Sequence, residues 1–382
     1  MVKKIIFLLT IGIIIIGKNY AYADSHQPQI NNLSEKLTDQ IHAKSWVIMD
    51  QKTGKILLQK DMNERHYPAS ITKIATAIYA IEHGNIKESV SVSESAAQTP
   101  GSSLYLHKGD TLPLKDLLYG IMLHSGNDGA VAIAEHFAGS EQSFTKKVTS
   151  FAQSLGTKNT NFTNASGLHD KNHYTNAYDM AIIARHAMDN QLFRQIASSK
   201  TYEWDRKYWT DQLKIHEKDD AKQVDYHWRN QQKLINHNRL LFNYDGATGI
   251  KNGFTHQSRY TLVGSAKRGN KELIVVVLRS PDRSTAYQDV TKLLDEGFQA
   301  YESILKDEEE TEGEESKKDK QSVSEFNNST SMSVGEDSGT EISAKKETEE
   351  EQTMAFKWMV LILLTFVILT LLIYKLVGRF KQ

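Results

Sequence analysis

Two apolar segments, one near each end of the 382-residue chain, confine the folded part to the residues between them. Near the N-terminus, Lys3 and Lys4 precede an apolar run over residues 5–16, and Ala21 and Ala23 are small residues at the usual spacing before a cleavage site. This pattern predicts a secretory signal peptide over residues 1–23. If the segment is not cleaved it acts as an anchor, and the domain after it still lies outside the membrane.

The apolar run at the other end extends from Trp358 to Tyr374 with aromatic residues at both margins, near the lower limit for a bilayer-spanning helix. Three cations follow it: Lys375, Arg379 and Lys381. Such cations stay in the cytoplasm under the positive-inside rule. The sequence therefore predicts a transmembrane helix over residues 355–377, a short cytoplasmic tail over residues 378–382, and a cell-membrane protein whose folded domain is extracellular.

Residues 306–354 are rich in Glu, Asp, Lys, Ser and Thr and almost free of aliphatic residues, so they cannot bury enough surface to fold. We expect a disordered, charged linker there. Residues 24–305 remain as one domain, large enough for a core of its own. Because the chain has no cysteine, this exported domain must rely on packing rather than on disulfides. The formal net charge of −1 gives no support for nucleic-acid binding.

A buried helix is predicted from Pro68 to Gly84, since isoleucine and alanine recur there at helical spacing and proline suits the first position. Ser70 and Lys73 lie three apart near its start, which makes their side chains neighbours on one face. A neutral lysine amine can take the proton of a serine hydroxyl, and burial or a second nearby cation favours that neutral form. Taken alone, the same pattern also suits an ordinary core helix.

A polar break at residues 125–129 separates two further apolar helical patterns, over residues 113–124 and 130–136. Because both flanks are expected to be packed, the break would hold polar side chains at a fixed place deep in the protein. A plain helix–helix turn is the alternative interpretation, because Ser, Gly, Asn and Asp all suit turns.

The last part of the domain has the pattern of an antiparallel sheet. Residues 259–266 and 273–278 are β-type runs joined by a hairpin turn at residues 267–270, which places Lys251 on or beside a neighbouring strand. Another hairpin is predicted near the start, from residues 45–49 and 55–59, and a closing helix over residues 290–301. His169 and His173 have no metal-ligand spacing and are interpreted as structural; no metal or cofactor is expected.

Three short motifs, each weak alone, follow one another in this domain: Ser-x-x-Lys at Ser70 and Lys73, Ser-x-Asn at Ser125 and Asn127, and Lys-x-Gly at Lys251 and Gly253. The ordered set resembles the active-site signature of penicillin-binding proteins and serine β-lactamases. Within that superfamily, residues 67–73, 123–135 and 164–168 are most similar to low-molecular-mass D-alanyl-D-alanine carboxypeptidases.

The resemblance implies an α+β fold of the β-lactamase/transpeptidase type, in which helices flank an antiparallel sheet and an all-helical subdomain lies beside it. It also implies catalytic roles: Ser70 is the nucleophile, Lys73 its base, and Ser125 the relay of a proton to the leaving amine. Asn127 would hold the substrate amide and Lys251 its terminal carboxylate. The backbone N–H groups of Ser70 and Phe254 would form the oxyanion hole.

The implied reaction is removal of the terminal D-alanine from peptidoglycan stem pentapeptides through an acyl-enzyme, with β-lactams acylating the same serine. One residue departs from the family pattern, because Asn252 stands where threonine or serine is usual between Lys251 and Gly253. We expect this change to shift the carboxylate contact chiefly to Thr255 and Lys251, and to reduce activity or alter the substrate range.

Three other functions stay open at the level of sequence. A β-lactamase must deacylate quickly, and class A enzymes use a Glu-x-x-Leu-Asn loop that none of the four intervening glutamates provides: Glu135, Glu141, Glu203 and Glu217. A weakly catalytic module for binding cell wall or sensing penicillin is suggested only by Asn252. A transpeptidase differs in whether an amine or water accepts the acyl group, which the residues do not decide.

Overall fold

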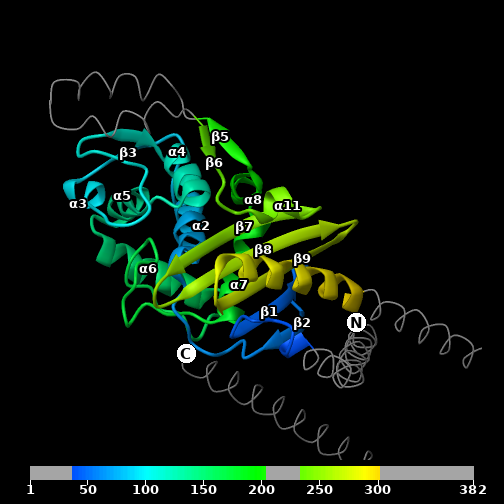
Figure 1. Cartoon of the computed structure of the whole chain (residues 1–382). Helices are drawn as coiled ribbons and strands as arrows, with labels where there is room; N and C mark the ends of the chain where they lie inside the picture. The colour runs from blue at the N-terminus through cyan, green and yellow to red at the C-terminus, as the bar shows by residue number, and fades with distance from the viewer. Residues whose placement is uncertain (1–36, 204–232, 302–382) are drawn as a thin grey trace, which may run out of the picture. The chain divides into compact units, whose positions relative to one another are not determined.

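A computed structural model of the chain describes residues 37–203 and 233–301 (Figure 1). The predicted signal peptide, linker, transmembrane segment and cytoplasmic tail lie outside these residues. Within the two described ranges, no helix combines the length and apolar character that membrane crossing requires.

A five-stranded antiparallel sheet forms the centre of the domain, in the order β2-β1-β9-β8-β7. Its strands are β1 (Ser45–Asp50), β2 (Ile56–Lys60), β7 (Ala247–Thr255), β8 (Arg259–Arg268) and β9 (Lys271–Ser280). The two hairpins expected from the sequence are confirmed, and Lys251 lies within β7. Because β7 is an edge strand, one side of its backbone is left for other partners.

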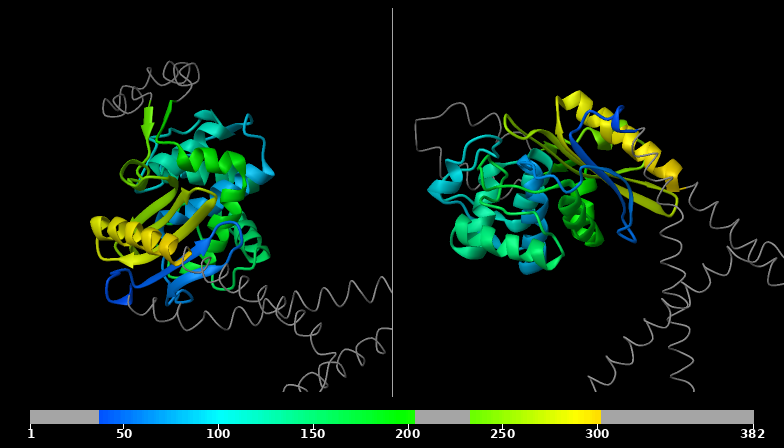
Figure 2. Two further views of the ribbon diagram at one scale, coloured as in Figure 1. Left: turned by 90° about the vertical axis from the view of Figure 1, so that its right-hand side faces the viewer. Right: turned by 90° about the horizontal axis from the view of Figure 1, so that it is seen from below.

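Both faces of the sheet are buried, and the period-two alternation of side chains divides them between two cores. Along β1, Val47 and Met49 belong to the core shared with the helices that follow β2, whereas Trp46 and Ile48 belong to a second core. A helix over residues 283–301 covers that second face, so the sheet lies between two helical layers (Figure 2).

The larger helical side begins with the helix of the Ser-x-x-Lys motif, which the structure divides in two. A short 3-10 turn, η1 (Ala69–Thr72), leads into α2 (Lys73–His83), and α2 packs on both α5 and α7. The other helices of this side are α3 (Glu94–Ala97), α4 (Leu114–Tyr119), η2 (Gly120–His124), α5 (Asn127–Ala138), α6 (Glu141–Ser154), α7 (Ala177–Asp189) and α8 (Gln191–Ser198). Of these, α7 and α8 contact the sheet, whereas α4, α5 and α6 form the helical part away from it.

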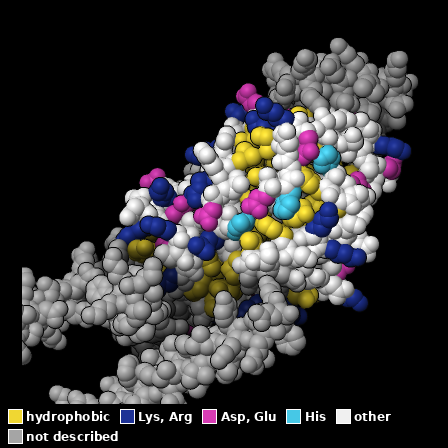
Figure 3. Space-filling view, turned by 180° about the vertical axis from the view of Figure 1, so that it is seen from behind, with side chains coloured by type: hydrophobic (Ala, Val, Ile, Leu, Met, Phe, Trp, Pro, Cys, Tyr) yellow, Lys and Arg dark blue, Asp and Glu magenta, His cyan; other side chains and the backbone are white. Residues whose placement is uncertain are grey.

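Short elements complete the described fold: β3 (Ser89–Ser91) pairs with β4 (Thr111–Pro113), β5 (Thr201–Glu203) pairs with β6 (Lys233–Ile235), and α11 (Leu240–Asn243) precedes β7. From behind, the described surface shows scattered apolar side chains among acidic, basic and histidine side chains (Figure 3). This mixture agrees with the near-neutral charge of the sequence.

Two element boundaries differ from those expected. The polar break is shorter than residues 125–129, because α5 already begins at Asn127 and leaves only Ser125 and Gly126 between helices. The closing helix begins at residue 283 rather than near residue 290. Asp282 explains the earlier start, since its carboxylate accepts a hydrogen bond from the backbone N–H of Thr285, 3.0 Å away, and caps the first turn.

Candidate active site

The amine of Lys73 is the centre of the site and joins three segments that are distant in the sequence. Its Nζ lies 3.1 Å from the Ser70 hydroxyl, 2.7 Å from the Asn127 side-chain oxygen and 2.7 Å from the Ser166 carbonyl oxygen. Lys73 is completely buried, whereas Ser70 is partly exposed. The first two predicted motifs therefore meet in the fold, and Ser166 is an additional partner that sequence reasoning missed.

Burial lowers the pKa of Lys73 well below its ordinary value, the charge of Lys251 lowers it further, and Asp128 opposes the shift. Two of the three Lys73 partners are carbonyl-type oxygens, which can only accept hydrogen bonds. A neutral amine satisfies them with its two N–H groups and keeps its lone pair for the third partner. The Ser70 hydroxyl can then donate to Lys73, which is the arrangement that general-base activation of a serine requires.

The loop that carries Ser166 is held in shape by Asn164 and Gly167. The Asn164 side-chain oxygen accepts from the Gly167 N–H at 2.7 Å, and its amide donates to the Leu168 carbonyl at 2.8 Å. Gly167 has a φ of +90°, and a Cβ there would lie 1.9 Å from the Ala69 carbonyl oxygen. The loop thus packs directly against the turn that presents Ser70, which lets its carbonyl reach Lys73.

The second motif lies at the junction of η2 and α5. Ser125 ends η2 with a left-handed backbone, φ 71°, and is 6% exposed, while Asn127 opens α5. The Asn127 amide donates to the Pro100 carbonyl at 2.7 Å, which fixes the orientation of the group and aims its oxygen at Lys73. Asp128 binds the neighbouring loop through the backbone N–H of Leu104.

The third motif lies on β7, where this edge strand passes closely over the Ser70 turn. A Cβ at Gly253 would come within 2.6 Å of the Ser70 backbone nitrogen, so only glycine permits this approach. Thr261 of β8 adds a hydrogen bond to the Pro68 carbonyl at 2.8 Å. Phe254 follows Gly253; its side chain is 43% exposed and packs on Tyr260, at 4.4 Å between ring centroids.

Lys251 is 1% exposed, and burial lowers its pKa to about 7. Its amine donates to the Asn252 carbonyl at 3.2 Å, and its positive charge lowers the pKa of Lys73. The site therefore contains two buried amines, and burial lowers the pKa of each.

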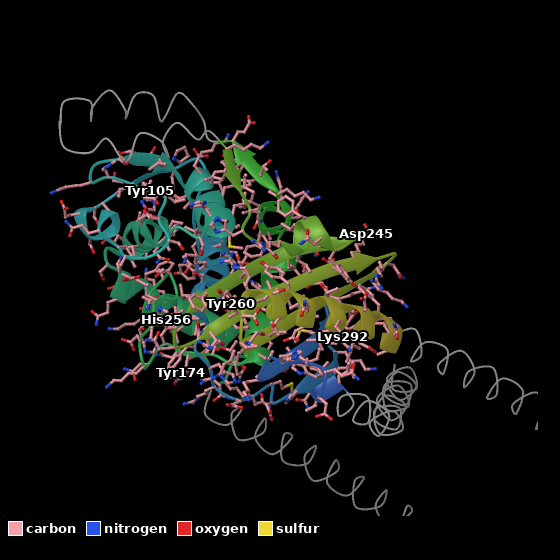
Figure 4. All side chains as sticks on the ribbon, viewed as in Figure 1. Tyr105, Tyr174, Asp245, His256, Tyr260 and Lys292 are labelled. Carbon is pink, nitrogen blue, oxygen red and sulfur yellow. The ribbon has the colours of Figure 1, made fainter. Side chains whose placement is uncertain are left out.

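Thr255, predicted from the sequence to contact a substrate carboxylate, has a role within the β7–β8 turn. Its hydroxyl donates to the Ser258 hydroxyl at 2.8 Å and accepts from the Ser258 N–H at 3.0 Å. The tip of this hairpin is where Figure 4 labels His256 and Tyr260. The substrate contact of Thr255 stays a prediction, and its hydroxyl is already engaged.

A cavity of about 480 Å³ opens beside the third motif. Its lining residues come from β6 and the loop after it, from the region of α11, from β7 and from the start of the closing helix: Ile235, Asn236, His237, Arg239, Phe242, Asn252 and Arg283. Sequence reasoning missed this group. Arg283 starts the closing helix, and only the path of the chain through β8 and β9 places that residue near Asn252 of β7.

His237 links this cavity to the Ser125 end of the cleft. Its backbone N–H donates to the Leu123 carbonyl at 2.9 Å, and its ring lies 4.6 Å from that of His124, the residue before Ser125. Burial lowers the pKa of His237 to about 4, with further lowering by the charges of His124 and Lys251. Within the described ranges, no group of three or more histidine or acidic side chains is arranged to hold a metal ion.

Residues 31–282 match the family model of Peptidase S11, D-alanyl-D-alanine carboxypeptidase. The chain belongs to this family. It is 35% identical over 368 residues to the D-alanyl-D-alanine carboxypeptidase DacF of Bacillus subtilis, covering 92% of this chain and 86% of that protein. Against DacA of Escherichia coli K12, the identity is 31% over 277 residues, which cover 69% of this chain and 63% of that protein.

Solved structures agree with this assignment. The carboxypeptidase is similar to DacD from Francisella tularensis, with a TM-score of 0.58, 31% identity, and coverage of 67% of this chain and 70% of that one. Penicillin binding protein 5 from Haemophilus influenzae gives a TM-score of 0.58, 33% identity, and coverage of 68% and 71%. A variant of the Streptomyces K15 DD-transpeptidase gives a TM-score of 0.59, 28% identity, and coverage of 68% and 98%.

The protein is thus a serine-type D-alanyl-D-alanine carboxypeptidase with the α+β transpeptidase-like fold. Its family acts on peptidoglycan peptides that end in D-alanyl-D-alanine and binds penicillin. The family and fold predicted from the three motifs are confirmed.

Proposed function

We propose that this carboxypeptidase trims peptidoglycan stem pentapeptides through an acyl-enzyme on Ser70. The observation that carries the proposal is the buried Lys73 amine, which lies 3.1 Å from the Ser70 hydroxyl and whose pKa is lowered well below its ordinary value. Ser70 Oγ attacks the carbonyl between the two terminal D-alanines, and its proton passes to Lys73 Nζ. The backbone N–H groups of Ser70 and Phe254 stabilise the oxyanion.

Collapse of the tetrahedral intermediate breaks the peptide C–N bond and leaves an ester on Ser70. Ser125, at the base of the cleft, relays the proton from Lys73 to the departing amine. Asn127 holds the substrate amide as well as Lys73. Water then attacks the ester and gives a proton to Lys73, the bond between the acyl carbon and Ser70 Oγ breaks, and Lys73 returns the proton to Ser70 Oγ.

The terminal carboxylate of the substrate is bound at the Lys251 end of the cleft. Lys251 supplies the first positive charge, and a bound carboxylate favours its ammonium form, since its pKa is close to neutrality. Arg283 and Asn252 line the adjoining cavity and supply further hydrogen-bond donors. In this proposal they, rather than Thr255, assist Lys251 in binding the carboxylate. A guanidinium suits a carboxylate because it offers two parallel N–H groups.

A β-lactam occupies the same cleft and acylates the same serine. Its carboxylate meets the same Lys251 charge, and its opened ring stays tethered, so no leaving group departs to make room for water.

We further propose that the domain works on the outer side of the cell membrane, attached through residues 355–377. The sequence pattern of both apolar termini supports this placement.

Turnover by the purified full-length protein tests the reaction. We expect release of one D-alanine from an N-acylated pentapeptide ending in D-alanyl-D-alanine, and a mass increase of one penicillin on Ser70 in peptide mapping. Ser70→Ala removes both. Ser154→Ala, on the exposed end of α6, is the matched control and keeps both. Turnover that survives Ser70→Ala would exclude the acyl-enzyme.

A further inference from the structure

The backbone of Ala165 is held by two helices that lie outside the loop of Ser166. Its N–H donates to the Glu141 carboxylate of α6 at 2.8 Å, and its carbonyl accepts from the Thr76 hydroxyl of α2 at 2.7 Å. Ala165 and Thr76 are each 1% exposed, so these bonds lie inside the protein. The next carbonyl along the chain is that of Ser166, 2.7 Å from the Lys73 amine. Fixing Ala165 therefore limits where this carbonyl can point.

Glu141 is a titratable group that the proposed reaction does not use. It lies in the first turn of α6, which packs on α2 and α5, and its side chain is half-buried. Among residues 37–203 and 233–301 its carboxylate makes one hydrogen bond, to Ala165, and no ion pair. Burial raises its pKa, the bond to Ala165 opposes that shift, and the charge of Glu135 adds to it. A hydrogen bond to an ionised acceptor is stronger than one between neutral groups, so this contact is suited to fixing a loop.

We propose that Glu141 is a positioning residue for the catalytic base, because its hydrogen bond to the loop holds the Ser166 carbonyl within reach of Lys73. The inference rests on the role proposed for Lys73 in forming the acyl-enzyme. With its two N–H groups bound by the Ser166 and Asn127 oxygens, a neutral Lys73 amine has its lone pair free for the proton of Ser70. If the loop moves away, the amine loses this fixed orientation and proton transfer slows.

Loss of the Ser166 contact also has a signature in the pH dependence of acylation. A carbonyl oxygen stabilises an ammonium more than an amine, so its departure lowers the pKa of Lys73 further. The charges that act on Lys73 come from Lys251 on β7 and Asp128 on α5, and a Glu141 variant keeps both. The buried ring of His173, whose pKa burial lowers to about 3, is neutral near pH 7 and is also kept. The acylation rate should therefore fall on its plateau while its acidic limb moves to lower pH.

The test is the second-order rate constant for acylation of the full-length protein by a fluorescent penicillin, measured from about pH 4 to about pH 9. Glu141→Ala is expected to lower the plateau about tenfold and to move the acidic limb by about one pH unit to lower pH, the effect of one hydrogen bond to a charged group. Glu141→Gln keeps an acceptor oxygen for the Ala165 N–H and should restore most of both. Gln142→Ala, at an exposed position in the same helical turn, is the matched control and changes neither.

Thr76→Val removes the hydroxyl on the other side of Ala165 and should move the acidic limb in the same direction, which gives a second result if Glu141→Ala does not fold. An acidic limb that keeps its place in both variants overturns the proposal, and so does a Glu141→Gln protein as slow as Glu141→Ala. Normal acylation of Glu141→Ala overturns this inference alone. A wild-type protein that penicillin does not acylate would overturn the proposed function as well.

Discussion

Two buried lysines belong to one site, and burial lowers the pKa of both. Burial disfavours the charged form of both amines, and the charge of Lys251 lowers the pKa of Lys73 further. Lys73 is additionally bound to two oxygens that accept its N–H groups, so its lone pair is directed at Ser70. We propose that Lys251 binds the substrate carboxylate, a negative ligand that would favour its charged form.

The pH dependence of kcat/KM for a peptide substrate should report both amines. We expect a fall above a pH of about 7, because Lys251 in the free enzyme then loses the proton that the carboxylate needs. A second fall at lower pH follows protonation of Lys73. Lys251→Arg keeps the charge at all these pH values and should remove the alkaline fall. An unchanged alkaline limb in this variant, with its fold checked by circular dichroism, would mean that another group causes it.

Arg283 and Thr255 are both candidates for binding the substrate carboxylate, and substitutions can distinguish them. Arg283→Leu should lower kcat/KM for the peptide about 10- to 100-fold, the usual effect of losing a hydrogen bond to a charged group. Thr255→Val should leave kcat/KM nearly unchanged and lower the free energy of unfolding by about 1 kcal/mol, because its hydroxyl serves the turn with Ser258. Steady-state kinetics and thermal melts separate the two. The reverse pattern would return the contact to Thr255.

At the scale of elements, the site depends on backbone segments that approach more closely than side chains permit. β7 crosses the Ser70 turn at Gly253, and the loop of Ser166 meets the same turn at Gly167. These two contacts bring a strand and a loop against the nucleophile from different parts of the chain. The oxyanion hole proposed for Ser70 and Phe254 needs this spacing, since N–H donors act only within about 3 Å of the developing charge.

Gly253→Ala tests this spacing directly. The added Cβ would lie 2.6 Å from the Ser70 nitrogen, so β7 must move outward. We expect acylation by a fluorescent penicillin to slow by about 100-fold or more, the usual cost of losing an oxyanion donor, with a fold that still melts cooperatively. Asn270→Ala, in the exposed turn between β8 and β9, is the control for an alanine replacement in this sheet. Normal acylation of Gly253→Ala would show that the spacing is not critical.

The sequence predicts those site residues whose arrangement depends on their spacing along one helix or hairpin. Ser70 and Lys73 lie one helical turn apart, and the hairpin turn between β8 and β9 fixed the sheet that carries Lys251. The Ser166 carbonyl was not predictable, because a backbone oxygen has no residue type to mark it. Arg283 and His237 were missed for a different reason, since only the sheet order brings their segments beside Asn252.

At the scale of the whole molecule, the carboxypeptidase domain needs both helical layers, because every central strand buries both faces. The outer layer supplies its own core residues from the closing helix: Val290, Leu293, Leu294 and Phe298. They cover side chains of β1 and β9 that would otherwise face water. Tyr301, the last described residue, packs against the same core.

Two truncations follow from this arrangement. A stop after residue 305 keeps the closing helix, so we expect a folded enzyme with unchanged D-alanine release that is secreted into the medium, because the proposed anchor is gone. A stop after residue 280 removes four large apolar side chains worth about 1.5–3 kcal/mol each, comparable with the total stability of a domain, and should give unfolded protein. Fractionation, D-alanine release and circular dichroism distinguish these outcomes. A shorter protein that stays with the membrane after the stop at residue 305 would place the anchor elsewhere, with an uncleaved N-terminal segment as the first candidate.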